Sequence, residues 1–102
     1  MSYETFTEMT YYETFTELVL EHQRSPSDDT KDRLTKIFKE IVRSTLMIIG
    51  RIEHVEYLEK VCNEKCFSKI NGFDPVRNGN AFNHFCNIIF DKLRVELRAL
   101  IS

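Results

Sequence analysis

Three observations predict an all-α domain of about four helices. The chain has 102 residues, which is the usual size of one domain. Apolar residues recur at the three- and four-residue intervals of a helix face in the segments 34–49, 53–70 and 80–100. No segment alternates apolar and polar residues in the way of a half-buried strand. We therefore expect a compact bundle of helices joined by short loops.

The N-terminal part contains a short internal repeat. The hexapeptide Tyr-Glu-Thr-Phe-Thr-Glu begins at Tyr3 and again at Tyr12. Only the second copy continues into apolar residues at helical spacing. We therefore predict a loose leader at 1–10 and a single domain at 11–102, whose first helix ends near residue 23.

A second helix is predicted from its start signal and its apolar stripe. Ser25 suits the N-cap position, Pro26 the first helical position, and Asp28 the position of a capping-box carboxylate. Gly50 is the expected break at the other end. The predicted inner face comprises Leu34, Ile37, Phe38, Ile41, Val42, Thr45, Ile48 and Ile49.

The third and fourth helices flank a loop rich in Pro, Gly and Asn. The third is expected over about 53–70 and should end at Asn71-Gly72, because Asn and Gly tolerate the left-handed conformation that closes helices. The fourth is expected from Asn80 to about Leu100. Phe82 is assigned to the core, because it begins the apolar stripe of this helix.

Charge and cysteine content exclude several classes of protein. The net charge of −2 argues against a general nucleic-acid coat, although residues 1–30 carry −6 and residues 31–71 carry +3. No apolar run approaches the roughly 20 residues of a transmembrane helix. The odd number of cysteines favours reduced thiols that pack as small apolar side chains.

Neither a metal nor a cofactor is expected. Cys62 and Cys66 share a helix face, but His84 and Cys86 are two residues apart on another helix and therefore face opposite ways. The same facing argument excludes a Cys–His dyad. The sequence has no Gly-rich phosphate loop, H-E-x-x-H motif or nucleophile elbow, so we do not expect an enzyme.

The turn before the fourth helix carries a family resemblance. The order Phe73-Asp74-Pro75, then Asn80-Ala81-Phe82, then Phe85 resembles region 2 of bacterial sigma factors, most closely the late-transcription sigma factors of tailed phages. The start of the second helix and the end of the third helix are also similar. The resemblance spans about 11–98, and its motif part is short.

The resemblance implies two binding surfaces and a place of action, the cytoplasm of a bacterial host. The helix before the turn would dock on the clamp helices of the largest subunit of host core RNA polymerase. The exposed contacts expected there are Glu56, Glu59, Lys60 and Asn63. The helix after the turn would meet the −10 promoter element, with Phe85 stacking on an unpaired base. The other residues expected at DNA are Arg77, Asn80, Ile88, Arg94 and Arg98.

Departures from the sigma pattern keep alternatives open. Asp91 lies where sigma factors usually have a basic group, and no second DNA-binding domain follows in this sequence. The leading hypothesis is a phage sigma-like factor that binds core polymerase, with the promoter as a separate expected contact. The first alternative is a sigma-derived polymerase regulator or inhibitor that does not read promoters. The second is a helical protein–protein interaction domain unrelated to transcription.

Overall fold

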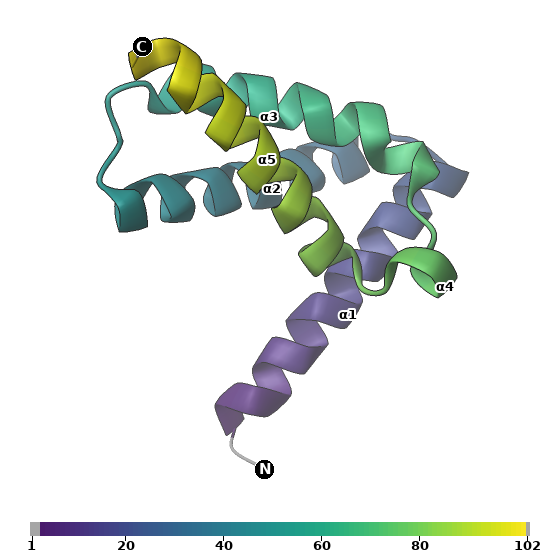
Figure 1. The fold of residues 1–102 in the computed structure, drawn as a ribbon. Coiled ribbons are helices and arrows are strands. Elements are labelled where there is room, and N and C mark those ends of the chain that lie inside the picture. The colour runs from purple at the N-terminus through teal and green to yellow at the C-terminus, as the bar shows by residue number, and fades with distance from the viewer. Residues whose placement is uncertain (1–2, 102) are drawn as a thin grey trace.

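The described part of the protein folds into helices and the loops that join them, as the sequence predicts. The computed structural model describes the backbone of residues 3–101 and the side chains of residues 14–100, and this part of the chain contains no strand. The helices, shown in Figure 1, are α1 (Tyr3–Arg24), α2 (Asp28–Ile49), α3 (Val55–Lys69), the 3-10 turn η1 (Ile70–Gly72), α4 (Pro75–Asn78) and α5 (Ala81–Ile101). None of these helices is both long and apolar enough to cross a membrane.

Helix α1 begins earlier than expected. It runs as one helix from Tyr3, although the sequence predicted a helix from about residue 11. Its first turns extend beyond the rest of the molecule (Figure 1), whereas Phe15, Leu18 and Val19 are buried in the bundle. The separation of a leader at 1–10 from a domain at 11–102 stays a prediction, because the side chains that would test it lie outside the described residues.

Helix α2 is capped at both ends by local interactions. Its N-cap is Ser27 rather than the predicted Ser25, and Thr30 takes the place of the capping-box carboxylate. The Thr30 backbone N–H donates to Ser27 Oγ at 3.1 Å, and the Ser27 backbone N–H donates to Thr30 Oγ1 at 3.2 Å. At the other end Gly50 has φ 70°, so it breaks the helix as predicted.

The connection from α3 to α5 differs in detail from the prediction. Helix α3 tightens into the 3-10 turn η1, and Gly72 does not adopt the left-handed conformation; among the described glycines only Gly50 and Gly79 have positive φ. The Gln23 side chain donates to the backbone oxygens of Ile70 at 2.6 Å and Phe73 at 2.9 Å, which ties α1 to this turn. The short helix α4, capped by Asp74, was not predicted.

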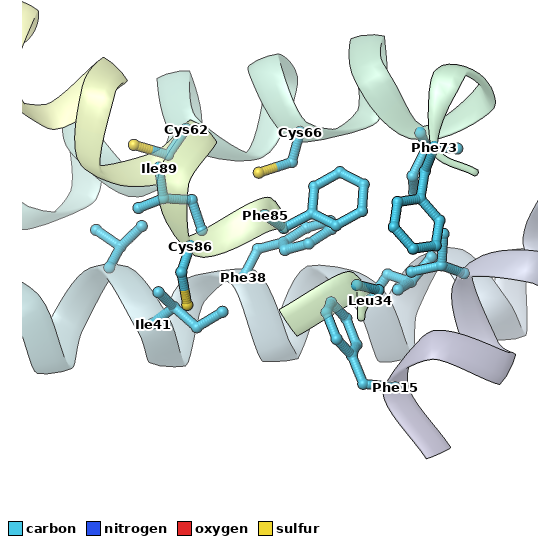
Figure 2. Close-up of a cluster of buried hydrophobic side chains, with 14 of the residues drawn as sticks. Phe15, Leu34, Phe38, Ile41, Cys62, Cys66, Phe73, Phe85, Cys86 and Ile89 are labelled. Atoms are coloured by element: carbon cyan, nitrogen blue, oxygen red, sulfur yellow. The ribbon is translucent and has the colours of Figure 1, made fainter. Parts of the chain in front are cut away.

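The core lies where α1, α2, α3 and α5 meet. Figure 2 shows Phe15, Phe38 and Phe85 from three different helices packed together, with ring centroids 5.4–6.2 Å apart. Cys62 and Cys66 of α3 and Cys86 of α5 are also buried here (Figure 2). Phe82, which the sequence assigned to the core, is only half-buried and packs against the buried cluster.

The predicted stripe of α2 is buried only along part of its length. Leu34, Phe38 and Val42 have no exposed surface, whereas Ile48 is 84 % exposed and Ile49 is 50 % exposed. The prediction that the last two residues face the core is therefore wrong. Leu46 at this end is buried, whereas Met47, Ile48 and Ile49 remain at the surface.

Candidate protein-docking groove

A polar groove runs between α2 and α3. It is lined by Thr35, Lys39 and Arg43 from α2 and by Glu56, Glu59, Lys60, Asn63 and Glu64 from α3. All four residues predicted to contact polymerase line this one groove. The sequence did not anticipate the contribution of α2, because nothing in a single sequence indicates which face of one helix packs beside another.

The ion pair between Arg43 and Glu59 fixes the two walls of the groove. Arg43 Nε lies 2.7 Å from Glu59 Oε2, and Arg43 Nη2 lies 3.3 Å from Glu59 Oε1, which is a two-pronged contact. The Glu59 side chain is only 6 % exposed, whereas that of Arg43 is 62 % exposed. The hydrogen bond and the charge of Glu59 raise the pKa of Arg43. The prediction of Glu59 as an exposed contact is therefore wrong: this carboxylate holds α3 against α2.

The remaining predicted contacts are better placed to meet a partner. Glu56 and Lys60 are exposed and stand one helical turn apart on α3. The Oδ1 atom of Asn63 is buried and has no hydrogen-bond partner among the described residues. A buried acceptor without a donor costs about 1–3 kcal/mol, so a donor from a docked molecule would remove this cost.

The charge of the groove favours a protein partner over a nucleic acid. Three basic side chains and three acidic ones line it, so the groove has no net charge. A phosphate backbone is normally bound by basic side chains without such acidic neighbours. A protein surface that carries charges of both signs matches the groove better.

The residues predicted to contact DNA differ in their exposure and in their partners. Arg77 is exposed on α4, and Asn80 Oδ1 accepts a bond of 2.8 Å from the Asn83 backbone N–H, which makes it a cap for α5. Ile88 is half-buried against the core. Arg94 Nη2 lies 2.7 Å from Asp91 Oδ1, which partly neutralises it, and Arg98 is exposed one turn further on.

Phe85 is the clearest correction to the predicted site. Its side chain has no exposed surface and lies at the centre of the core (Figure 2). Its ring centroid is 5.9 Å from that of Phe73 and 5.1 Å from that of His84. A ring that is enclosed in this way cannot stack on a base, so the structure contradicts the base-binding role.

The three buried thiols of the core are poor nucleophiles. Burial raises the pKa of Cys62 to about 12 and raises those of Cys66 and Cys86 as well, so all three thiols stay protonated at neutral pH. Burial also lowers the pKa of His84. Within the described part of the chain, no three His, Cys, Asp or Glu side chains are grouped to hold a metal ion.

Sequence reasoning missed an exposed apolar surface at the end of α2. It comprises Met47, Ile48 and Ile49 in the last turn of α2 and Ile52 in the loop that follows, and we call it the apolar end of α2. A signal was present, because the apolar stripe of α2 runs without interruption to Gly50.

Comparison of the chain with protein-family models, with curated proteins and with solved structures found no match.

Proposed function

We propose that this protein docks on the core RNA polymerase of a bacterial host, in the host cytoplasm, and regulates it without capturing a promoter base. The observation that carries the proposal is the groove between α2 and α3. The residues that the sigma resemblance implies as polymerase contacts line this groove, and its mixed charge suits a helical protein surface.

The groove provides a rigid surface with charges at fixed positions. Because the Arg43–Glu59 pair joins α2 to α3, the two walls move together. Glu56 and Lys60 then present one negative and one positive group to the partner. Charges arranged in this way orient a partner and speed its association more than they add affinity.

Loss of promoter-base capture is the part of the proposal that differs from a sigma factor. Moving a buried Phe into water costs about 1.5–3 kcal/mol, before the loss of packing in the cavity is counted. Stacking of one base on an exposed aromatic side chain contributes about 1–3 kcal/mol. Exposing Phe85 therefore offers no net gain, and regulation through the polymerase surface is the better-supported activity.

A pull-down with purified core polymerase tests the docking. We expect wild-type protein to be retained, and Glu56→Lys and Lys60→Glu each to reduce the affinity by about tenfold, which corresponds to roughly 1.4 kcal/mol. The matched controls are Glu21→Lys on α1 and Arg94→Glu on α5, both at exposed positions away from the groove. Absence of wild-type retention, or equal retention of all variants, would contradict the proposal.

A promoter-binding sigma factor is the second candidate, favoured by the exposed cations Arg77 and Arg98 on α4 and α5. Transcription in vitro separates the two candidates. A promoter-binding factor would create new start sites with core enzyme alone. A regulator would change only the activity of the host sigma factor at its own promoters.

A protein–protein interaction domain unrelated to transcription is the third candidate. It is favoured by the apolar end of α2, which is a contact surface independent of the groove. Binding of another protein through this surface, together with failure to bind polymerase, would support it.

A further inference from the structure

The polar groove between α2 and α3 contains an unpaired hydrogen-bond acceptor. Asn63 Oδ1 is buried in the wall of this groove and accepts no hydrogen bond. Among the side chains that the structure describes, it is the only buried polar atom in this condition. Most buried side-chain oxygens in proteins have a donor, so the exception requires a physical explanation.

The ion pair between Arg43 and Glu59 locates Asn63 within the groove. Helices α2 and α3 are joined by a short loop and run in opposite directions (Figure 1). Asn63 follows Glu59 by about one turn of α3, and Lys39 precedes Arg43 by about one turn of α2. Asn63 and Lys39 therefore lie near each other along the groove that both line. The ammonium group of Lys39 nevertheless does not donate to Asn63 Oδ1.

The charges around Asn63 favour an uncharged donor from outside the chain. Arg43 and Glu59 neutralise each other through their contact of 2.7 Å. A cationic donor would then meet as many basic side chains as acidic ones, and it would lose more hydration than an amide or a hydroxyl group. The remaining charged side chains of the groove are Lys39, Lys60, Glu56 and Glu64.

We propose that Asn63 recognises an uncharged hydrogen-bond donor, an amide or hydroxyl side chain of the docked protein. The N–H or O–H group of the partner donates to Asn63 Oδ1, while Glu56 and Lys60 orient the partner by their charges. A partner without this donor leaves the acceptor buried and unpaired, so the groove discriminates against it. The inference rests on the proposed docking to polymerase and names the chemical group that the groove selects there.

This role predicts opposite effects on stability and on binding. Because the acceptor is unpaired in the free protein, an apolar side chain of similar shape at position 63 should stabilise that state. The same change removes the hydrogen bond to the partner, so it should weaken docking. A residue that served only the fold would lower stability and affinity together.

Asn63→Leu tests the proposal in two measurements. We expect a higher urea midpoint for the free protein and about tenfold weaker binding to purified core polymerase. Asn87→Leu is the matched control, because Asn87 is exposed on α5 and its replacement makes the same gain in helix propensity. The control should raise the midpoint less and leave binding unchanged.

Two further variants test the identity of the donor. Asn63→Asp keeps an acceptor oxygen and adds a negative charge, so tighter binding of this variant would indicate a cationic donor and overturn the proposal. Lys39→Met should leave the urea midpoint unchanged. A loss of stability in Lys39→Met that disappears when Asn63→Leu is also present would reveal an internal bond to Lys39, which would likewise overturn the proposal.

The outcomes separate this inference from the proposed function. A midpoint for Asn63→Leu no higher than that for Asn87→Leu would overturn the inference whether or not polymerase binds. Equal binding of wild type and Asn63→Leu would overturn the inference and leave the docking intact. Failure of wild type to bind polymerase would contradict the proposed function and, with it, the partner named here.

Discussion

The two halves of α2 share one apolar stripe but have different fates. In the first half, Leu34 and Phe38 are fully buried beneath α1, α3 and α5. In the last turn, Ile48 and Ile49 are exposed. Leu46 in the same turn is fully buried, but Ile48 and Ile49 face away from the core, and α1 points away from this end (Figure 1). The difference teaches that an apolar stripe marks a surface that will be covered, but not what will cover it.

Substitution in the first half should have the largest effect. We expect Phe38→Ala to lower the free energy of unfolding by about 3–5 kcal/mol, because it removes a ring that contacts both Phe15 and Phe85. Ile48→Ala, the matched change in the last turn, should alter it by less than about 0.5 kcal/mol in dilute monomer. Urea unfolding measures both. Equal effects at the two positions would break the comparison.

Substitution of Gly50, which ends α2, should have an intermediate effect on the free energy of unfolding. Gly50 has φ 70°, and a Cβ placed on it would meet no atom within 4 Å. Gly50→Ala should therefore cost about 1–2 kcal/mol through backbone strain alone, without a steric clash. Thermal unfolding of Gly50→Ala beside Gly72→Ala tests this, because Gly72 has no positive φ and is equally open. A larger loss in Gly72→Ala would contradict the argument.

Removal of the N-cap of α2 should have a slightly smaller effect on the free energy of unfolding. Ser27→Ala removes the acceptor for the Thr30 backbone N–H and should cost about 1 kcal/mol. Ser25→Ala is the control, because Ser25 was the cap that the sequence predicted and Ser27 is the cap in the structure. Chemical unfolding should separate the two variants. A greater loss in Ser25→Ala would restore the first assignment.

The smallest expected effect is the pH dependence of stability that comes from His84, whose ring lies beside Phe73. The His84 ring lies 5.2 Å from that of Phe73, and burial lowers its pKa below the ordinary value of about 6.5. The unfolded chain therefore binds a proton at His84 more readily than the folded chain does. The contribution of His84 to stability is present above about pH 6.5 and is lost as the pH falls through and below it.

Substitution of His84 isolates this effect from the titration of carboxylates. His84→Gln should unfold with a shallower pH dependence than wild type between neutral and mildly acidic pH. His54→Gln, at an exposed histidine, is the control. Unfolding curves at several pH values provide the measurement, and identical slopes for wild type and His84→Gln would contradict the assignment.

Prediction from sequence succeeded where local signals were strong. The all-α class, the helix break at Gly50 and the packing of the cysteines as small apolar side chains were all predicted correctly. Prediction failed where the sequence offered two similar candidates for one role. Ser25 and Ser27 both fit an N-cap, and Phe82 and Phe85 are three residues apart on one helix. Only packing decides which member of each pair is used.

The candidate site shows the same limit. The family resemblance named four of the five residues of α3 that line the groove, but neither Glu64 nor the burial of Glu59 against Arg43 was predicted. Sixteen positions of chain separate these two side chains, so their contact depends on how α2 and α3 pack. The role of Glu59 changed from exposed contact to structural tie for this reason.

The sequence by itself determined the all-α class and the break of α2 at Gly50, because helix periodicity and helix breaks act between residues that are close in the chain. The tertiary structure alone decided which apolar faces are covered, because burial depends on contacts between residues far apart in the chain. It enclosed Phe85 and left Ile48 exposed. Both carry the same kind of apolar signal, and the difference lies in whether another helix reaches them.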